Sequence, residues 1–368
     1  MQRFYSILPV LILALCGYHP AWANETETPA VTETTFELVS EKHVALLLPL
    51  DSPAFAEAAK AVQAGFEAAG QHERTAPRAI RLYATSDDPL DVFVAYQQAV
   101  SAGAVLVIGP LTRDGVSAVA SSHISVPTLT LNTVDSSTAL PTKLYLFGLQ
   151  METEAVHMAT LAAATDRHHA IVIGDDSSLS RRMQTAFTKS WQSTDGNTST
   201  VLRYSDDPTK LAQFRSLTTG SNHLIFLALD AAKSRLLRAY LDPDVPVYAT
   251  SQVFTGNDHF LQNNDLNGII FSDIPWLLQP DHPAVMVYRQ SGKTQSADME
   301  RLYALGIDAF RLMVRLLRSP DASEIALDGV TGQIHFTFPA LFAREPVTAQ
   351  FVEGKAQLTQ TRQPSTTP

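Results

Sequence analysis

No part of the chain limits its fold more than the stretch from His43 to Gly70, HVALLLPLDSPAFAEAAKAVQAGFEAAG. The apolar run from Val44 to Leu48 predicts a strand that is buried on both faces, as in a parallel sheet. A turn follows at Pro49 to Ser52, where Ser52 can cap a helix that Gly70 can end. The apolar residues between them fall on one helical face. The stretch therefore predicts a strand-turn-helix unit that opens an α/β domain, with its turn where such sheets bind ligands.

The same alternation of apolar strands and amphipathic helices continues along most of the chain. A long core-facing helix is expected at 299–318, and the 368 residues are enough for two lobes. We expect further strands at 79–85, 105–108, 127–131, 170–173, 200–204, 223–229, 245–249 and 269–271. The fold class is therefore α/β, with two doubly wound parallel-sheet lobes in a bilobal arrangement.

The lobe boundaries follow from two segments, 144–148 and 272–276, that we interpret as crossings between the lobes. Residues 332–338 and 347–351 are expected to form a terminal β pair. Such a molecule has a cleft lined by strand ends from both lobes, with hinge closure as its natural motion. The expected divisions are a signal peptide at 1–23, a linker at 24–42, a first lobe at 43–147 and 276–325, a second lobe at 148–275 and 326–353, and a disordered tail at 354–368.

The N-terminus has the pattern of a signal peptide. Arg3 precedes an apolar segment from Phe4 to Leu15, and Ala21-Trp22-Ala23 fits a cleavage site. We expect cleavage after Ala23, export to the periplasm and no transmembrane segment. Cys16, the only cysteine, raises the alternative of an outer-membrane lipoprotein acylated at that residue, although the bulky Leu15 before it fits that pattern poorly.

The charge balance narrows the range of partners. The formal net charge is −10, and charged residues make up 17% of the chain. This acidic balance argues against nucleic acid as a partner and against a basic surface for membranes.

No catalytic motif withstands inspection. Gly292-Lys293-Thr294 resembles the end of a phosphate loop, but Val287 occupies the position of the required first glycine. The sequence contains no Gly-x-Ser-x-Gly, no Ser-x-x-Lys and no His-Glu-x-x-His. We therefore expect a protein that is not an enzyme and that needs no cofactor or metal.

Small polar residues follow several of the predicted strands. Because parallel strands end at the same edge of a sheet, these groups could hold the carboxylate of a small ligand. The simpler interpretation is that Ser, Thr, Asn and Asp are common in turns and at helix N-termini. The candidate ligand-binding residues are Thr112, Asn132, Thr133, Asp175, Ser177 and Ser251.

Several segments, taken in order and spacing, resemble the C-terminal domain of the penicillin-binding protein activator family. The resemblance runs from about His43 to Phe351 and implies a type I periplasmic-binding-protein (Venus flytrap) fold without enzymatic activity. It also implies a periplasmic regulator of peptidoglycan synthesis that binds and stimulates a bifunctional penicillin-binding protein. Besides the opening stretch, the segments are VIGPL at 107–111, LTLN at 129–132, YATS at 248–251, GIIFSDIP at 268–275 and RLYALGIDAF at 301–310.

A second function stays open because amino-acid-binding receptors of ABC transporters share that fold. The alternative is a periplasmic solute-binding receptor for an amino-acid-like or muropeptide ligand. By this resemblance, Thr112 and Asn132-Thr133 would hold the ligand carboxylate. Asp175 is a positional candidate for the ligand amine.

Overall fold

The computed structural model describes residues 41–73, 78–134, 139–257, 260–289, 295–319 and 321–359. The predicted signal peptide, Cys16, nearly all of the linker and the Gly292-Lys293-Thr294 segment lie outside the described residues. Within the described part of the chain, none of the helices has the length and apolar character needed to cross a membrane.

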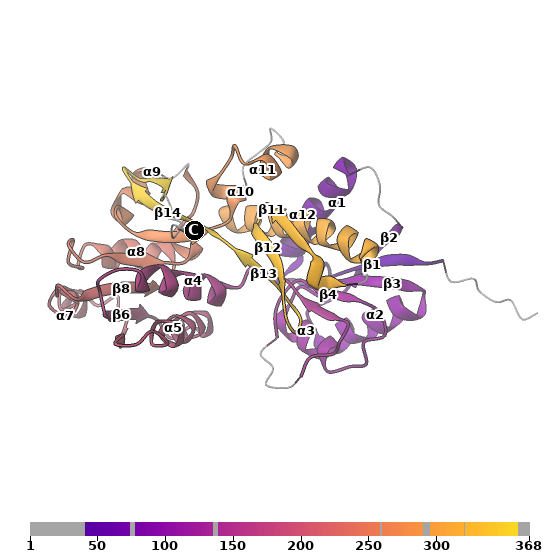
Figure 1. The fold of residues 1–368 in the computed structure, drawn as a ribbon, viewed down its shortest axis with the longest axis horizontal. Helices are drawn as coiled ribbons and strands as arrows, with labels where there is room; N and C mark the ends of the chain where they lie inside the picture. Colours follow the sequence, from indigo (N-terminus) through magenta and orange to yellow (C-terminus); the bar gives the residue numbers. More distant parts are fainter. Residues whose placement is uncertain are drawn as a thin grey trace, which may run out of the picture. The chain divides into compact units, whose positions relative to one another are not determined.

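The first sheet has eight strands in the order β11-β12-β13-β5-β4-β3-β1-β2. Its strands are β1 (His43–Leu48), β2 (Ala79–Ala84), β3 (Ala104–Ile108), β4 (Thr128–Thr130), β5 (Leu144–Leu146), β11 (Ala326–Gly329), β12 (Gly332–Thr337) and β13 (Leu341–Glu345). β1 to β5 are parallel, and β13 pairs with β5 in the same direction. Figure 1 shows the C-terminal strands β11 to β13 beside strands from the N-terminal part of the chain.

The second sheet has seven strands in the order β15-β14-β10-β9-β8-β6-β7. Its strands are β6 (His169–Gly174), β7 (Thr198–Arg203), β8 (His223–Ala228), β9 (Val247–Ala249), β10 (Ile270–Asp273), β14 (Val347–Val352) and β15 (Lys355–Leu358). β7, β6, β8, β9 and β10 are parallel, whereas β14 runs antiparallel to β10 and β15.

Helices cover both faces of each sheet. The α-helices are α1 (Ala56–His72), α2 (Pro89–Ser101), α3 (Arg113–Ala120), α4 (Met151–Ala163), α5 (Ser178–Trp191), α6 (Pro208–Leu211), α7 (Phe214–Thr218), α8 (Ala231–Arg238), α9 (Phe260–Asn263), α10 (Pro275–Leu278), α11 (Pro283–Tyr288) and α12 (Ala297–Arg318). The short 3-10 helices are η1 (Ser251–Val253), η3 (Asn264–Leu266) and η4 (Ala322–Glu324).

The alternation of side chains along β1 explains this layering. Val44, Leu46 and Leu48 pack in one core with α1 and α12. Ala45 and Leu47 pack on the opposite face with α2 and α3. Every residue of β1 is buried, as a strand covered on both faces requires. β6 does the same in the second sheet, where Ile171 and Ile173 face one core and Ala170 and Val172 face another.

Two glycines bring α1 and α12 into close contact. A Cβ atom at Gly65 would lie 1.9 Å from the carbonyl oxygen of Tyr303, and one at Gly306 would lie 2.0 Å from that of Val62. The helix backbones therefore approach more closely than any side chain at these positions would allow. Figure 1 shows the two helices side by side over the first sheet.

Some expected boundaries differ from the structure. Gly70 does not end its helix, because α1 continues to His72 and Gly70 packs against the ring of Phe310. The expected cap at Ser52 is also wrong, because α1 begins at Ala56 with Phe55 as its N-cap residue, and the Ser52 hydroxyl instead accepts hydrogen bonds from the amides of Ala54 and Phe55 in the turn before the helix. The segment 144–148, expected only to cross between lobes, first forms β5.

The C-terminal strands show the largest difference. Residues 326–345, expected in the second lobe, form β11 to β13 of the first sheet. The expected terminal pair of 332–338 with 347–351 is wrong, because β12 pairs with β11 and β13, whereas β14 pairs with β10 and β15. The expected disordered tail begins too early, since residues 355–358 form β15; residues 360–368 lie outside the described residues.

Candidate functional site

The first group of candidate residues lies at the carboxyl ends of β3 and β4. The Oγ1 atom of Thr112 accepts a hydrogen bond from the amide of Gly115 at 3.2 Å and so caps α3. The side chain of Asn132 donates to the carbonyl of Leu111 at 3.0 Å and accepts from the amide of Thr133 at 2.9 Å. These residues therefore do lie together, but Thr112 and Asn132 already bond to the backbone of the turns after β3 and β4.

The second group lies at the carboxyl end of β6. Ser177 caps α5 through the amide of Ser180, and its own amide donates to Asp175. The ammonium of Lys233 lies 2.6 Å from Oδ2 of Asp175 and 2.9 Å from Oδ2 of Asp230. Burial acts to raise the pKa of Asp175, but hydrogen bonds from Lys233 and Ser177 outweigh it and hold the pKa at about 2. Asp175 is thus an ionised carboxylate that already has a cationic partner.

The carboxylate of Glu152 joins helices that pack on different sheets. Oε1 of Glu152 on α4 lies 2.7 Å from Nη2 of Arg113 on α3 and 2.7 Å from Nε of Arg182 on α5. The three side chains are roughly one-quarter to one-third exposed, so the pairs are partly screened by water. They place an ion-pair bridge directly beside Thr112, where a ligand carboxylate was expected.

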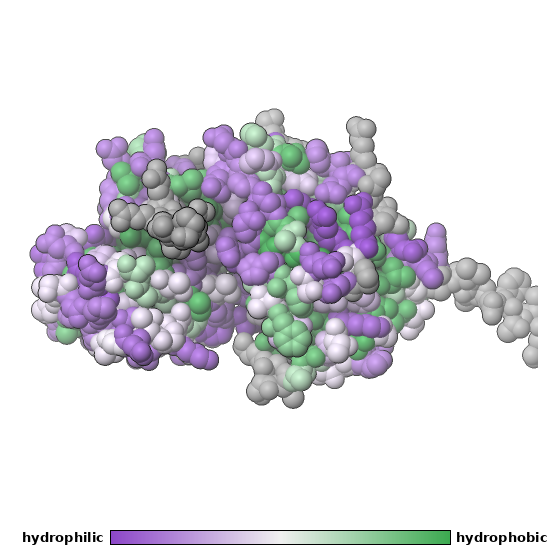
Figure 2. All heavy atoms as spheres, in the orientation of Figure 1, coloured by the Kyte–Doolittle hydropathy of each residue, from purple (hydrophilic) through white to green (hydrophobic). Residues whose placement is uncertain are grey.

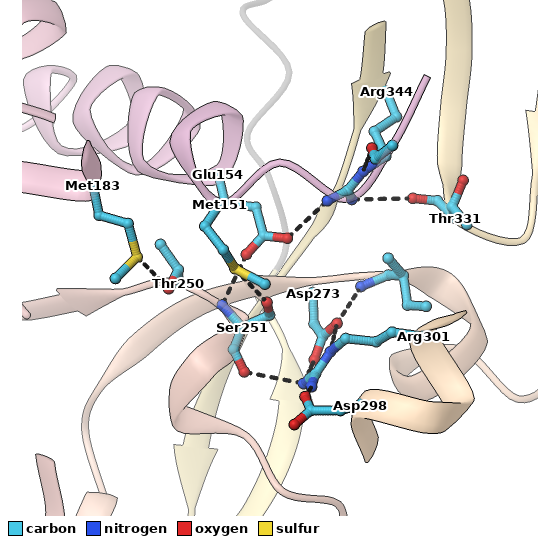
Figure 3. Close-up of polar contacts among 12 residues, drawn as sticks. Met151, Glu154, Met183, Thr250, Ser251, Asp273, Asp298, Arg301, Thr331 and Arg344 are labelled. Atoms are coloured by element: carbon cyan, nitrogen blue, oxygen red, sulfur yellow. Dashed lines mark hydrogen bonds and ion pairs between the residues drawn. The ribbon is translucent and has the colours of Figure 1, made fainter. Parts of the chain in front are cut away.

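Ser251 belongs to a different, fully buried cluster, which we call the hinge cluster and define as Glu154, Ser251, Asp273, Arg301 and Arg344. Figure 3 shows these side chains turned toward one another. The amide of Ser251 donates to Oε2 of Glu154 at 2.9 Å, and its carbonyl accepts from Arg301 at 3.0 Å. Its hydroxyl lies 3.4 Å from the sulfur of Met151. The backbone of Ser251, more than its hydroxyl, is therefore the part that the cluster uses.

Arg301 of α12 makes the densest set of contacts in the hinge cluster. Its guanidinium holds both carboxylate oxygens of Asp273, at 3.0 and 2.6 Å, and the carbonyl of Phe254 at 2.8 Å. A further bond joins it to the exposed Asp298. Burial acts to lower the pKa of Arg301, but Asp273 raises it above the ordinary value, so the guanidinium stays charged. Burial raises the pKa of the Asp273 carboxyl, and Arg301 acts in the opposite direction.

Arg344 of β13 completes the hinge cluster. Its Nη2 lies 2.9 Å from Oε1 of Glu154, and its Nε donates to the carbonyl of Gly148 at 3.2 Å. The two side chains are 1% and 2% exposed. Buried ions of this kind occur almost only when they are paired, which holds for every charge in the hinge cluster.

Among the described residues, no hydrogen bond or ion pair joins Thr112, Asn132 or Thr133 to Asp175, Ser177 or Ser251. The structure thus divides the candidates into the β3–β4 group, the β6 group and the hinge cluster.

The sequence reasoning missed Lys233 and Asp230 in the β6 group, and Glu154, Asp273, Arg301 and Arg344 in the hinge cluster. A signal existed for Asp230, because it lies two residues after the end of β8 and caps α8 as Ser177 caps α5.

An open polar pocket lies beside the β6 group, at the end of β7. It has a volume of about 580 Å³ and is lined by Arg203, Tyr204, Ser205, Asp206 and Lys210. Arg203 pairs with Asp176, which follows Asp175. Within the described ranges, no set of three or more His, Cys, Asp or Glu side chains could hold a metal ion.

Comparison with known proteins identifies relatives over nearly all of this architecture. A family model described as "LppC putative lipoprotein" matches residues 17–354. The penicillin-binding protein activator LpoA of Photobacterium profundum is 26% identical over 390 residues, which cover 94% of this chain and 62% of that relative. The chain therefore spans less than two thirds of the length of this relative.

Solved structures confirm the fold. A structure described as "a putative branched-chain amino acid ABC transporter" from Chromobacterium violaceum is 36% identical, with a TM-score of 0.72, and covers 84% of this chain and 100% of that one. The C-domain of LpoA from Haemophilus influenzae, described as a regulator of PBP1A, has a TM-score of 0.72 at 23% identity and covers 86% and 99%. The predicted bilobal type I periplasmic-binding-protein fold, with two doubly wound α/β halves, is confirmed.

The family is settled by the extent of the model match, which includes every strand of the two sheets except β15 and every residue of the hinge cluster. This protein belongs to the LppC family, in which its curated relatives are named penicillin-binding protein activators.

Proposed function

We propose that this protein is a non-catalytic periplasmic regulator of peptidoglycan synthesis that binds and stimulates a bifunctional penicillin-binding protein. The observation that carries this proposal is the relationship to penicillin-binding protein activators over 94% of the chain. A protein that stimulates an enzyme by contact needs a stable surface, and it needs no catalytic groups of its own.

The geometry of the charged groups supports a role without catalysis. A general acid or base needs a proton that it can exchange near neutral pH. Asp175, with a pKa of about 2, is paired with Lys233, and the carboxylates of the hinge cluster are buried against arginines. These carboxylates therefore serve as partners of cationic side chains within the fold.

The decisive test is direct binding and a change in synthase rate. The purified full chain should bind a bifunctional penicillin-binding protein of its own cell and raise its rate of glycan polymerisation or of transpeptidation. A monofunctional transpeptidase from the same cell is the matched partner control. The proposal is wrong if no bifunctional synthase binds at micromolar concentrations, or if binding leaves both rates unchanged.

We place the site of action in the periplasm, on the basis of the N-terminal sequence. The family description, with the word lipoprotein, supports the acylated form at Cys16 more strongly than the sequence pattern alone. Mass spectrometry of the protein from its native envelope distinguishes the two forms. A chain that starts at Asn24 indicates ordinary cleavage, whereas a diacylated Cys16 indicates a membrane anchor.

A second candidate, a solute-binding receptor, is favoured by the 36% identity to the transporter protein from Chromobacterium violaceum. Its ligand would meet the pocket at the end of β7 and the polar residues beyond β3, β4 and β6. A ligand at 100 times its Kd adds about 2.7 kcal/mol to the free energy of unfolding. A thermal-shift screen of amino acids and muropeptides should show this increase, and a flat screen would remove the candidate.

A further inference from the structure

The chain passes between the two sheets after β5, after β10 and after β13. Closure of a two-lobed binding protein requires the crossing residues to change their backbone angles. The last crossing consists only of the buried Pro346, between β13 and β14, and proline fixes its own φ. This crossing therefore has little freedom of its own.

Arg344 fastens the last crossing to the first one. It stands two residues before Pro346, and its guanidinium holds the carbonyl of Gly148, which lies between β5 and α4. The same guanidinium holds Glu154 of α4, whose second oxygen accepts the amide of Ser251 after β9. One buried ion pair thus joins strand β13 of the first sheet to helix and loop residues around the second.

Arg301 fastens the middle crossing. It extends from α12, which packs on the first sheet, to the carboxylate of Asp273, the last residue of β10 in the second sheet. Asp273 also accepts the amide of the next residue, Ile274, at 2.8 Å. The amide of Trp276 in turn donates to the carbonyl of Val330 at 2.9 Å, so the backbone of this crossing is held on both sides of Ile274.

The bridge at Glu152 adds a third contact away from the hinge cluster, because it joins α3 to α4 and α5. Its partial exposure makes it weaker than the buried pairs. Opening or closing the lobes would have to disturb the buried ion pairs of the hinge cluster. Separating buried charges is costly, because water cannot reach them to replace the lost partner.

We infer that Arg301 and Arg344, through Asp273 and Glu154, lock the hinge of this fold, so that the two lobes keep one fixed arrangement and do not close around a ligand. The locked hinge would be a property of the chain whether or not it binds a synthase. It contrasts with the hinge closure that the fold class leads one to expect.

The test is a distance measurement between the lobes by pulsed electron paramagnetic resonance. Cysteines for spin labels replace the exposed Gln98 on α2 and Lys189 on α5, in a Cys16→Ser background that leaves no other cysteine. The otherwise natural chain should give one narrow distance, unchanged by millimolar amino acids. A broad or double distribution, or a shift on adding amino acids, would overturn the inference without any further variant.

Variants then ask whether the arginines are the cause. Glu154→Gln and Arg301→Lys should each broaden the distribution or add a second distance, and Glu57→Gln, in an exposed pair with Lys60, should not. A folded Glu154→Gln or Arg301→Lys protein with the same narrow distance as the parent would overturn the assignment to these pairs. Circular dichroism establishes which variants are folded. If neither Glu154→Gln nor Arg301→Lys folds, the distance distribution of the parent chain alone decides whether the lobes keep one arrangement. A hinge that proves mobile would not affect the result of the synthase-binding test, so the locked hinge and the proposed function can be refuted independently.

Discussion

Arg344 and Glu154 are 190 positions apart in the chain, yet Nη2 of one lies 2.9 Å from Oε1 of the other in a nearly dry environment. Loss of one partner from a buried pair leaves an uncompensated charge and costs about 3–5 kcal/mol. We therefore expect Arg344→Met to lower the free energy of unfolding by about that amount, measured by urea denaturation.

Two variants calibrate this expectation. Lys60→Met removes one partner of the exposed pair with Glu57 and should cost no more than about 1 kcal/mol. Arg344→Met combined with Glu154→Leu should be more stable than Arg344→Met alone, because the buried carboxylate is gone. An Arg344→Met protein as stable as Lys60→Met would show that the buried pair contributes nothing.

The contact of α1 with α12 gives a second prediction. Gly65→Ala places a methyl group 1.9 Å from a backbone oxygen that has no room to move, so the helices must separate. Overpacking of this kind typically costs about 1–3 kcal/mol, more than the roughly 1 kcal/mol that alanine gains over glycine in a helix. Thermal unfolding should show a lower Tm for Gly65→Ala.

Gly70→Ala is the matched control, since it lies in the same helix. Its added methyl group would meet the Phe310 ring at 3.2 Å, and a side chain can shift where a backbone cannot. Its Tm should stay well above that of Gly65→Ala. Equal Tm values for the two variants would mean that the close approach of the backbones is unimportant.

The strands were predictable because burial on both faces leaves an apolar run, as in VALLL of β1 and HLIFLA of β8. Their partners at the C-terminus were not. Both β12 and β14 have the local pattern of a strand, but pairing between distant segments is decided by contacts that no local pattern records. The sequence reasoning therefore paired two strands that belong to different sheets.

The two buried arginines could have been suspected from the sequence, because they occupy buried positions in otherwise regular helix and strand patterns. Counting only the apolar residues does not detect them. In α12, Arg301 lies four residues after Ala297 and four before Leu305, and all are on the buried face. In β13, Arg344 alternates in step with the buried Phe342. A charged residue at a core position of a regular pattern requires a partner, but sequence alone does not say which carboxylate lies within reach.

Stability in acid should depend on Asp175. Its pKa of about 2 lies below the value of about 3.9 for an aspartate in an unfolded chain. A lowered pKa in the folded state means that the carboxylate stabilises the protein fully above pH of about 4, and that this contribution disappears as the pH falls toward about 2.

We expect Asp175→Asn to flatten the dependence of the free energy of unfolding on pH between about 4 and about 2. Lys233→Met should flatten the same window, because the hydrogen bond from Lys233 is the largest of the contacts that lower this pKa. Urea denaturation at a series of pH values measures both. Curves for Asp175→Asn and the natural chain that run parallel through this window would contradict the expectation.

Thr112 separates a structural role from a binding role. The Thr112 hydroxyl caps α3, so its removal in Thr112→Ala should lower the free energy of unfolding by about 1 kcal/mol, whereas Thr112→Ser keeps a hydroxyl and should cost less.

If the chain acts through contact with a synthase, Thr112→Ala should still stimulate the enzyme at a temperature where it is folded. If it acts as a solute receptor, both substitutions should keep the fold while only Thr112→Ala loses the thermal shift with ligand. Loss of synthase stimulation in a folded Thr112→Ala protein would place the turn after β3 in the contact surface, against the expectation that its hydroxyl serves only the helix.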